Sequence, residues 1–422
     1  MARAPNPNGQ FGQEVQVVMV TPELKRGRNK LAATVVLGHV IKHVYNSGFQ
    51  TIILPEIKIG LGLSATELGW IAASRQATGW FTTMGAGYAA DRFANRASLM
   101  LGLSLSLMGI SYFIAGNAPN FWMMLGAMLL VGIGPSIYHP PAIGALSRRF
   151  PDRRGFALSL HGAGGSTGEV LGPLVTAGAL AVLVWQDVLR VGLFPALLAA
   201  LLIWSLMRGV PSAQVTAQST AEYFSSIMKL LKKGAMLTLV GVTVLRSMGQ
   251  SSVTIFLPVY LREDLEYSAL RVALYLSMAQ VVGIGAQPVM GILSDRFGRK
   301  AVIVPSMFGM GLLFVALRYA DPGPQLILTI IAMGAFLYSL HSLFIASALD
   351  VAGGQLHSTV VSMIYGASFL GILAPVLAGL IADRYGTENA FLFAGALVFL
   401  SAVIILFLRL PRTATQVAGG HR

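Results

Sequence analysis

Four charged side chains stand within long apolar stretches of this 422-residue sequence: Lys42, Arg75, Glu169 and Arg246. A charge at the centre of a membrane-spanning helix costs roughly 2.5–3.5 kcal/mol when it faces lipid. These residues are therefore expected to face a cavity or one another, and three cations against one acid leave an excess of positive charge. Because arginine and lysine suit carboxylates, phosphates and phosphonates, the excess predicts a site for a small organic anion.

A polar stripe surrounds the first of these charges. His39, Lys42, His43 and Asn46 recur at i, i+3, i+4 and i+7, which is one face of a helix. The stripe is expected to face a cavity, although its members could instead hydrogen-bond to neighbouring helices. Arg75 could equally belong to an outer gate. The predicted substrate-binding residues are Lys42, Arg246, His39, His43, Asn46, Arg75, Tyr138 and Gln250.

Glu169 is the predicted proton carrier. Burial raises the proton affinity of a carboxylate and a nearby cation lowers it, so its charge could depend on whether an anion occupies Lys42 or Arg246. A fixed salt bridge to Lys42, for which Glu169 is the only acid within an apolar stretch, is the alternative. His139 is a second proton-coupling candidate, but Pro140 follows it, so a structural role is equally open.

The elements that must position these residues are long apolar segments. Each is about the length that crosses a bilayer as a helix. They fall at 31–54, 66–89, 97–116, 121–145, 156–181 and 188–208, and then at 234–259, 269–292, 300–319, 325–348, 358–382 and 389–410. The predicted organisation is a tail at 1–30, a six-helix bundle at 31–208, a linker at 209–233, a second bundle at 234–410 and a tail at 411–422. The predicted fold is an all-α integral membrane protein with twelve transmembrane helices.

Composition and charge agree with this organisation. Only 11% of the residues are charged, where soluble proteins carry about 25%. The net charge of +13 does not indicate nucleic-acid binding, because the cations cluster between apolar segments. If both termini are cytoplasmic, 21 of the 30 lysines and arginines lie in cytoplasmic segments and six outside. The sequence has no cysteine, which excludes disulfides and thiol chemistry.

The two bundles repeat one another at an offset of about 203 residues. Leu54-Pro55 matches Leu257-Pro258, Gln76 matches Gln280, and His139 falls opposite His341. Gly87-x3-Asp91-Arg92-Phe93 matches Gly291-x3-Asp295-Arg296-Phe297. Matches in the same order along both halves indicate duplication of a six-helix unit, in which substrate sits between the halves near the bilayer midplane.

One of these matches carries a family resemblance. Gly291-Ile-Leu-Ser-Asp295-Arg296-Phe-Gly298-Arg299-Lys300 resembles the loop signature of the major facilitator superfamily, although Ala94 and Asn95 depart from it in the first half. A partial third copy is Gly379-x3-Asp383-Arg384. The resemblance implies two pseudo-symmetric bundles, alternating access, and an inner gate formed by Asp91, Arg92, Asp295, Arg296 and Arg299.

Within the superfamily, the histidine-bearing first segment and Gly132-x-Gly134-x-Ser136-x-x-His139-Pro140 look closest to bacterial exporters of the fosmidomycin-resistance type, which expel a phosphonate. A bacterial inner-membrane transporter is therefore expected, acting as a monomer in the lipid bilayer on a small anionic substrate with a coupling proton. A multidrug efflux pump for neutral or cationic compounds is the alternative, and a transporter-like sensor without flux is a third possibility. No enzyme, cofactor, metal-ligand cluster or nucleic-acid partner is expected.

Overall fold

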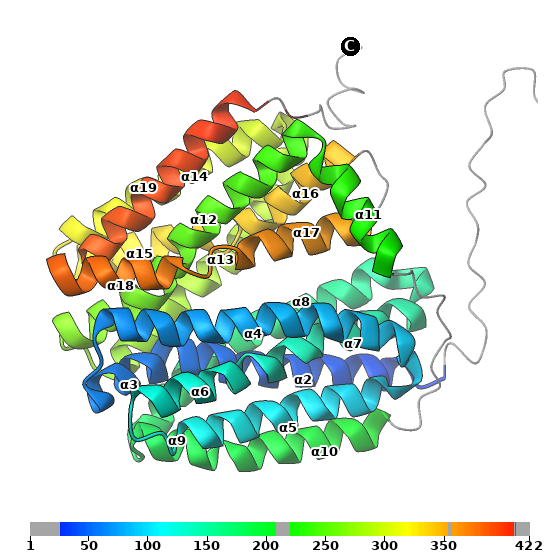
Figure 1. The fold of residues 1–422 in the computed structure, drawn as a ribbon, viewed down its shortest axis with the longest axis horizontal. Coiled ribbons are helices and arrows are strands. Elements are labelled where there is room, and N and C mark those ends of the chain that lie inside the picture. Colours follow the sequence, from blue (N-terminus) through cyan, green and yellow to red (C-terminus); the bar gives the residue numbers. More distant parts are fainter. Residues whose placement is uncertain (1–25, 208–219, 353–356, 409, 411–422) are drawn as a thin grey trace, which may run out of the picture.

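We analysed a computed structural model of the chain, which describes residues 26–207, 220–352, 357–408 and 410. Every regular element within these ranges is a helix (Figure 1). Residues 1–25 of the predicted tail at 1–30, the predicted tail at 411–422, and residues 209–219 of the predicted linker lie outside the described residues. Each of the twelve apolar segments is mainly helical where it is described, and some are formed by two helices in succession, which confirms the all-α prediction.

The N-terminal half contains six helical segments in sequence order. They are α2 (Arg28–Gly48) continuing through η1 (Phe49–Ile53) into α3 (Leu54–Leu61); α4 (Ala65–Arg92); α5 (Ala97–Ala115); α6 (Phe121–Val131) with α7 (Ile133–Arg149); α8 (Arg154–Leu180); and α9 (Trp185–Val191) with α10 (Leu193–Met207). Short 3-10 turns, η2 (Ala94–Arg96) and η3 (Pro151–Arg153), join α4 to α5 and α7 to α8.

The C-terminal half follows a connecting helix, α11 (Thr220–Leu231). Its segments are α12 (Gly234–Val259) with η4 (Tyr260–Asp264); α13 (Ala269–Phe297); α14 (Arg299–Tyr319); α15 (Pro324–Leu337) with α16 (Leu340–Ala352); α17 (His357–Phe369) with α18 (Ala374–Tyr385); and α19 (Asn389–Phe407). Among the described residues, seven helical stretches are long and apolar enough to cross a membrane by length and composition alone: Ala97–Ala115, Phe121–Arg149, Trp185–Met207, Ala269–Phe297, Arg299–Tyr319, Pro324–Ala352 and Asn389–Phe407.

The first predicted segment was too short. Its helix does not stop near residue 54 but passes through the π-helical turn η1 and continues to Leu61. Pro55 follows the π-helical turn, where the pattern of backbone hydrogen bonds already changes, so its missing N–H does not end the helix. The helix ends instead at Gly62, which adopts the left-handed conformation (φ 62°) that glycine tolerates best.

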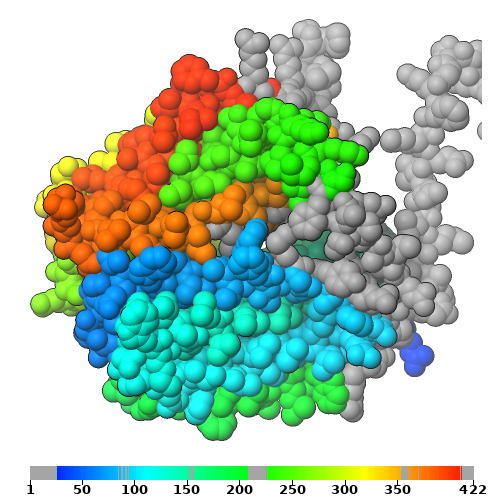
Figure 2. Space-filling view, in the orientation of Figure 1, coloured from blue at the N-terminus to red at the C-terminus, as the bar shows by residue number. Residues whose placement is uncertain are grey.

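The two halves pack through backbone contacts between α4 and α18. A Cβ added to Gly69 would lie 2.4 Å from the carbonyl oxygen of Pro375, and one added to Gly379 would lie 2.4 Å from that of Ala65. Helices α8 and α13 make a second contact, in which Ser277 donates a hydrogen bond to the carbonyl of Val170 (2.9 Å). In Figure 2 the blue and orange surfaces of these halves meet without a gap at the left.

Charged side chains join the halves at the end of the molecule that carries α3 and η4, which we call the α3 end. Lys58 pairs with Glu263 (2.5 Å), and Arg262 pairs with Glu56. Asp383 accepts hydrogen bonds from the backbone N–H groups of Ala65 (2.7 Å) and Thr66 (2.8 Å) and from the Thr66 hydroxyl (2.5 Å). The carboxylate therefore caps the N-terminus of α4 from the opposite half, so the α3 end is closed.

At the other end, which carries α11 and which we call the α11 end, the described ion pairs stay within one half. Arg28 pairs with Asp152 (3.0 Å) in the N-terminal half. Arg299 pairs with Asp295 (2.5 Å) and Asp350 (2.8 Å) in the C-terminal half. The exposed Arg296 lies against Phe297, its own neighbour. The side chains of Asp91 and Arg92 lie outside the described residues, so the predicted inner gate stays a prediction.

Candidate functional site

Close packing of α2 on α8 brings the first group of predicted residues together. A Cβ added to Gly168 would lie 2.3 Å from the carbonyl oxygen of Val40 and 2.7 Å from Cβ of His43, and one added to Gly172 would lie 2.6 Å from the carbonyl of Val44. Only glycine permits such a backbone approach. Because Glu169 follows Gly168, the contact carries its carboxylate onto the polar stripe of α2.

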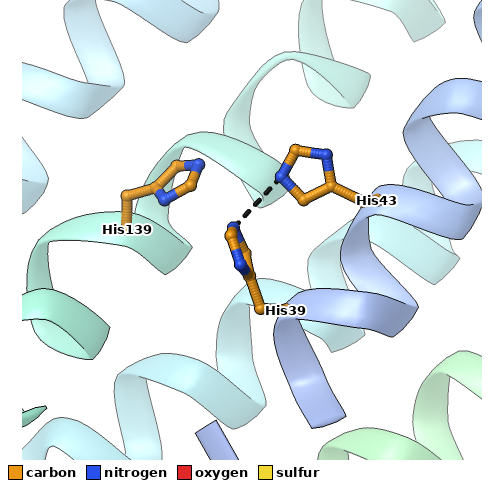
Figure 3. Close-up of side chains that lie close together, drawn as sticks. All are labelled: His39, His43 and His139. Carbon is orange, nitrogen blue, oxygen red and sulfur yellow. Dashed lines mark hydrogen bonds between the residues drawn. The ribbon is translucent and has the colours of Figure 1, made fainter. Parts of the chain in front are cut away.

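The stripe faces α7 and α8 and is mostly buried, rather than lying open to a cavity. His39 and Lys42 are each 4% exposed. The His39 ring stacks on that of His161 at 3.7 Å between centroids, and its Nδ1 lies 2.7 Å from the His161 carbonyl oxygen. Its Nε2 lies 3.1 Å from Nε2 of His43 (Figure 3). The alternative interpretation, hydrogen bonding between neighbouring helices, describes His39 in this structure.

The salt bridge between Lys42 and Glu169, which was the alternative to a proton-carrier role for Glu169, is not formed in this structure. Nζ of Lys42 lies 2.6 Å from Nε2 of His139 and 3.4 Å from Nε2 of His43. Glu169 instead places Oε1 3.2 Å from Nδ1 of His43, with 39% of its side chain accessible. Sequence could not show that an imidazole 97 positions away would come closer to Lys42 than the acid does.

No metal-ligand cluster was expected from the sequence, but the structure brings three imidazoles together. One ring nitrogen from each of His39, His43 and His139 lies within 4.8 Å of the other two (Figure 3). Imidazoles at such spacing could hold a transition metal. The Lys42 nitrogen, however, lies between His43 and His139, and two cations in one buried site repel each other. The cluster therefore suits an ammonium group better than a metal ion.

A second group of predicted residues lies in the C-terminal half around Arg246, which is only 1% exposed. Nη1 of Arg246 donates to Oε1 of Gln250 (2.5 Å), and Nη2 lies 3.3 Å from the Ser247 hydroxyl and 3.4 Å from Nδ1 of His341. Its guanidinium carbon lies 5.3 Å from the Phe344 ring centroid. Nε of Arg246 and Nε2 of His341 are buried without a hydrogen-bond partner among the described residues.

The two groups are related by the sequence repeat. In each half a cation on the first segment contacts a histidine on the fourth: Lys42 contacts His139, and Arg246 contacts His341. The offset between His139 and His341 was the signal that could have added His341 to the predicted site. Ser247 and Phe344 gave no such signal, because serine and phenylalanine are common in membrane helices.

These two cations differ from those near the helix ends. Seven cations near helix ends in the described part of the chain each pair with a carboxylate: Arg28, Lys58, Arg153, Arg190, Arg262, Arg299 and Arg318. Among the residues that the structure describes, no carboxylate oxygen lies within 4.0 Å of Lys42 or Arg246. The two buried cations have neutral partners only, which leaves their charge uncompensated.

Three predicted residues remain: Tyr138, whose ring centroid lies 5.9 Å from that of His39, and Asn46 and Arg75. Tyr138 is fully buried and donates its hydroxyl to the carbonyl of Val35 (2.8 Å), so in this conformation it joins α7 to α2. The amide oxygen of Asn46 accepts a hydrogen bond from Tyr112 of α5 (3.4 Å). Both contacts are made inside the N-terminal bundle.

Arg75 lies near the α3 end. Its guanidinium carbon is 5.7 Å from the centroid of Phe49, and the two residues line a cavity that Ile255 of α12 closes from the other half. The cavity measures about 20 Å³, which is room for about one water molecule. It is too small for an organic anion, which favours the outer-gate interpretation of Arg75 over direct substrate contact in this conformation.

Comparison with known proteins identifies the family to which this chain belongs. The sequence profile described as Major Facilitator Superfamily matches residues 40–289 and 239–422. The chain belongs to the major facilitator superfamily. It is therefore a membrane transporter and not an enzyme, as predicted.

Individual relatives of this superfamily member span most of its length. The fosmidomycin resistance protein of Escherichia coli K12 is 27% identical over 380 residues, covering 88% of this chain and 92% of that one. The probable sulfoacetate transporter SauU of Cupriavidus necator is 23% identical over 385 residues, covering 84% and 87%. The crystal structure of the nucleoside transporter NupG superposes with a TM-score of 0.74 at 14% identity, over 90% of this chain and 98% of that one, which shows a shared fold.

Proposed function

We propose that this transporter moves a small organic anion, a carboxylate or a phosphonate, by alternating access with proton coupling. The observation that carries the proposal is Arg246, which is buried, lacks an acidic partner among the described residues, and has one N–H group without an acceptor there. A buried guanidinium in that state binds an anion well, because its N–H groups match the oxygens of carboxylates and phosphonates. Lys42, one position before the residue that the repeat aligns with Arg246, adds a second cation from the other half.

Two of the relatives fit a substrate of this charge. One is named for resistance to fosmidomycin, a phosphonate, and another for transport of sulfoacetate. The two cations lie in different halves, so movement of the halves would change their separation and with it the affinity for an anion. Closure of the α3 end by Lys58, Glu263 and Asp383 is the contact that such movement must break. We further propose that the α3 end faces outward and that both termini are cytoplasmic, in keeping with the distribution of lysine and arginine.

The test is uptake of labelled fosmidomycin and sulfoacetate into proteoliposomes under an imposed pH gradient. Arg246→Gln is expected to lower the initial rate about tenfold or more, since hydrogen bonds to charged groups contribute about 1.5–3 kcal/mol. Lys42→Met should lower it as well. Arg153→Gln is the matched control, because Arg153 lies in an exposed turn with 68% of its side chain accessible. Wild-type rates for every transported anion in both site variants would refute the anion site.

The alternative is efflux of neutral or cationic compounds, and one observation favours it. Glu169 is partly accessible and could attract a cation, since its contact with His43 leaves 39% of the side chain uncovered. Under this alternative, cells would lose protection against cationic dyes in Glu169→Gln but keep it in Arg246→Gln. The anion proposal predicts that the protein gives no protection against such dyes in either variant.

A further inference from the structure

Glu169, His43 and His39 form a continuous line of polar contacts. Oε1 of Glu169 lies 3.2 Å from Nδ1 of His43, whose Nε2 lies 3.1 Å from Nε2 of His39. The line ends where Nδ1 of His39 lies 2.7 Å from the carbonyl oxygen of His161. Because a carbonyl oxygen only accepts, Nδ1 of His39 must carry a hydrogen. With this hydrogen assigned, the protons held by the three residues can be counted from the other two contacts.

Each of the other two contacts also needs a hydrogen between its atoms, since two lone pairs at these distances repel. Glu169, His43 and His39 together therefore hold three titratable protons in this arrangement. Two neutral imidazoles and a carboxylate would hold only two. The extra proton is required whether it resides on the carboxylate or on a ring.

We propose that Glu169, His43 and His39 form the proton-binding site of this transporter, and that Lys42 links its occupancy to the substrate anion. The inference rests on the proposed anion transport and names the residues of its coupling. His43 thereby gains a role as the direct partner of Glu169, while His139 contacts Lys42 and lies at the side of the line.

The surroundings of the line are cationic or neutral in the described part of the chain. The titratable and charged groups facing it from α2, α4, α7, α8 and the end of α15 are Lys42, Arg75, Tyr138, His139, His161 and Tyr338. Tyr338 belongs to the C-terminal half and is near enough to interact electrostatically with Glu169. Movement of the halves would therefore change the environment of the carboxylate directly.

The position of Lys42 sets the sign of the coupling. Its nitrogen lies 3.4 Å from Nε2 of His43, so a positive charge there repels a proton on the line. An anion that neutralises Lys42 removes this repulsion and strengthens proton binding. By thermodynamic reciprocity the proton strengthens anion binding equally. Anion and proton therefore bind cooperatively, and the anion binds more tightly as the pH falls.

A measurement without substrate tests the proton site itself. The chain has seven histidines, so ¹⁵N-histidine labelling of the full-length protein gives a spectrum simple enough to assign by single substitutions. His39 is expected to be protonated at Nδ1. Glu169→Gln should change the ring signals of His43 and leave those of His341, in the other half, unchanged. A bare Nδ1 on His39, or a His43 signal indifferent to Glu169→Gln, would overturn the site.

Calorimetry with fosmidomycin in two buffers of different ionisation enthalpy tests the linkage. When wild type binds the anion it should take up as much as about one proton per anion. Glu169→Gln should still bind the anion but take up almost no protons. Asp187→Asn, which alters a surface ion pair within one half, should behave as wild type. Proton release, or no pH dependence, would overturn the sign of the coupling. Absence of binding with the histidine signals as expected would instead refute the anion substrate.

A measurement of Zn²⁺ binding distinguishes the proton site from a metal site. Stoichiometric binding of Zn²⁺ by wild type that is lost in His139→Ala would show that the imidazoles form a metal site, and the proton assignment would be wrong. The proposed arrangement predicts only weak Zn²⁺ binding, which Lys42→Met strengthens by removing the resident cation.

Discussion

Replacing Asp383 with asparagine is expected to open the α3 end of this transporter. The carboxylate accepts three hydrogen bonds from the other half: two from backbone N–H groups at the start of α4 and one from the Thr66 hydroxyl. Asp383 comes from the partial third copy of the loop motif, at the end of α18. The contact exists only while the α3 end is closed, so its loss destabilises that state alone.

The magnitude follows from the kind of contact. Hydrogen bonds to a charged group contribute about 1.5–3 kcal/mol, and a carboxylate at a helix N-terminus gains about 0.3–1 kcal/mol from the helix dipole when exposed. Asparagine keeps one acceptor oxygen and retains part of this. We therefore expect a net loss of about 1–2 kcal/mol, which raises the open-to-closed ratio about 5- to 30-fold.

Distance measurement by double electron–electron resonance can detect this shift directly. The chain has no native cysteine, so Val182→Cys and Asp321→Cys introduce two spin labels without further changes. Both positions are exposed at the α3 end, and they lie in opposite halves. Asp383→Asn should increase the population with a long distance between the labels.

Asp187→Asn is the matched control, since it removes a carboxylate near the same end whose partner, Arg190, lies in its own half (2.9 Å). The control should leave the distance distribution unchanged. An unchanged distribution in Asp383→Asn, or an equal shift in Asp187→Asn, would refute the assignment of Asp383 as a lock between the halves.

Three further predictions follow from other contacts. Gly168→Ala should destabilise the protein by about 1–3 kcal/mol and separate Glu169 from His43, whereas Gly178→Ala on the same helix, with nothing within 4 Å of an added Cβ, should be tolerated; thermal unfolding compares them. Lys58→Glu should impair transport by placing like charges across the α3 end, and adding Glu263→Lys should restore it; failure of the double variant would exclude a specific pair. Burial raises the pKa of Asp152, but the hydrogen bond and charge of Arg28 more than offset this, so the pKa lies below the ordinary 3.8. A carboxyl group whose pKa is lower in the folded than in the unfolded state stabilises the fold at pH values above its unfolded pKa. That stabilisation is lost as the pH falls through the folded pKa. Asp152→Asn should therefore lower the melting temperature more at about pH 7 than at about pH 2, and equal effects at both would contradict the pairing.

The repeat and the apolar periodicity predicted most of the fold. An offset near 203 residues related Leu54-Pro55 to Leu257-Pro258, and it also related His139 to His341, whose contacts with Lys42 and Arg246 correspond in the structure. The spacing of Arg246 and Gln250 is one helical turn, and the two side chains meet. Such relations are local or repeated, so sequence reveals them.

Other relations depend on how closely two helices approach. The glycines of α8 bring Glu169 to His43 and not to Lys42. These two residues are adjacent on α2, so a rotation by a fraction of a helical turn decides which of them contacts Glu169. The same approach stacks His161 on His39, which sequence spacing could not show because the two residues lie 122 positions apart. Helix periodicity gives the face of a residue, while packing decides its partner.

The most direct test of anion recognition is equilibrium binding of a labelled phosphonate to purified wild type, Arg246→Gln and Arg153→Gln. The uncompensated charge of Arg246 predicts that Arg246→Gln raises the Kd at least about tenfold while Arg153→Gln leaves it unchanged. A neutral ester of the same phosphonate should bind wild type and Arg246→Gln equally weakly. Equal Kd values for the phosphonate in wild type and Arg246→Gln would contradict the assignment of Arg246 to the substrate site.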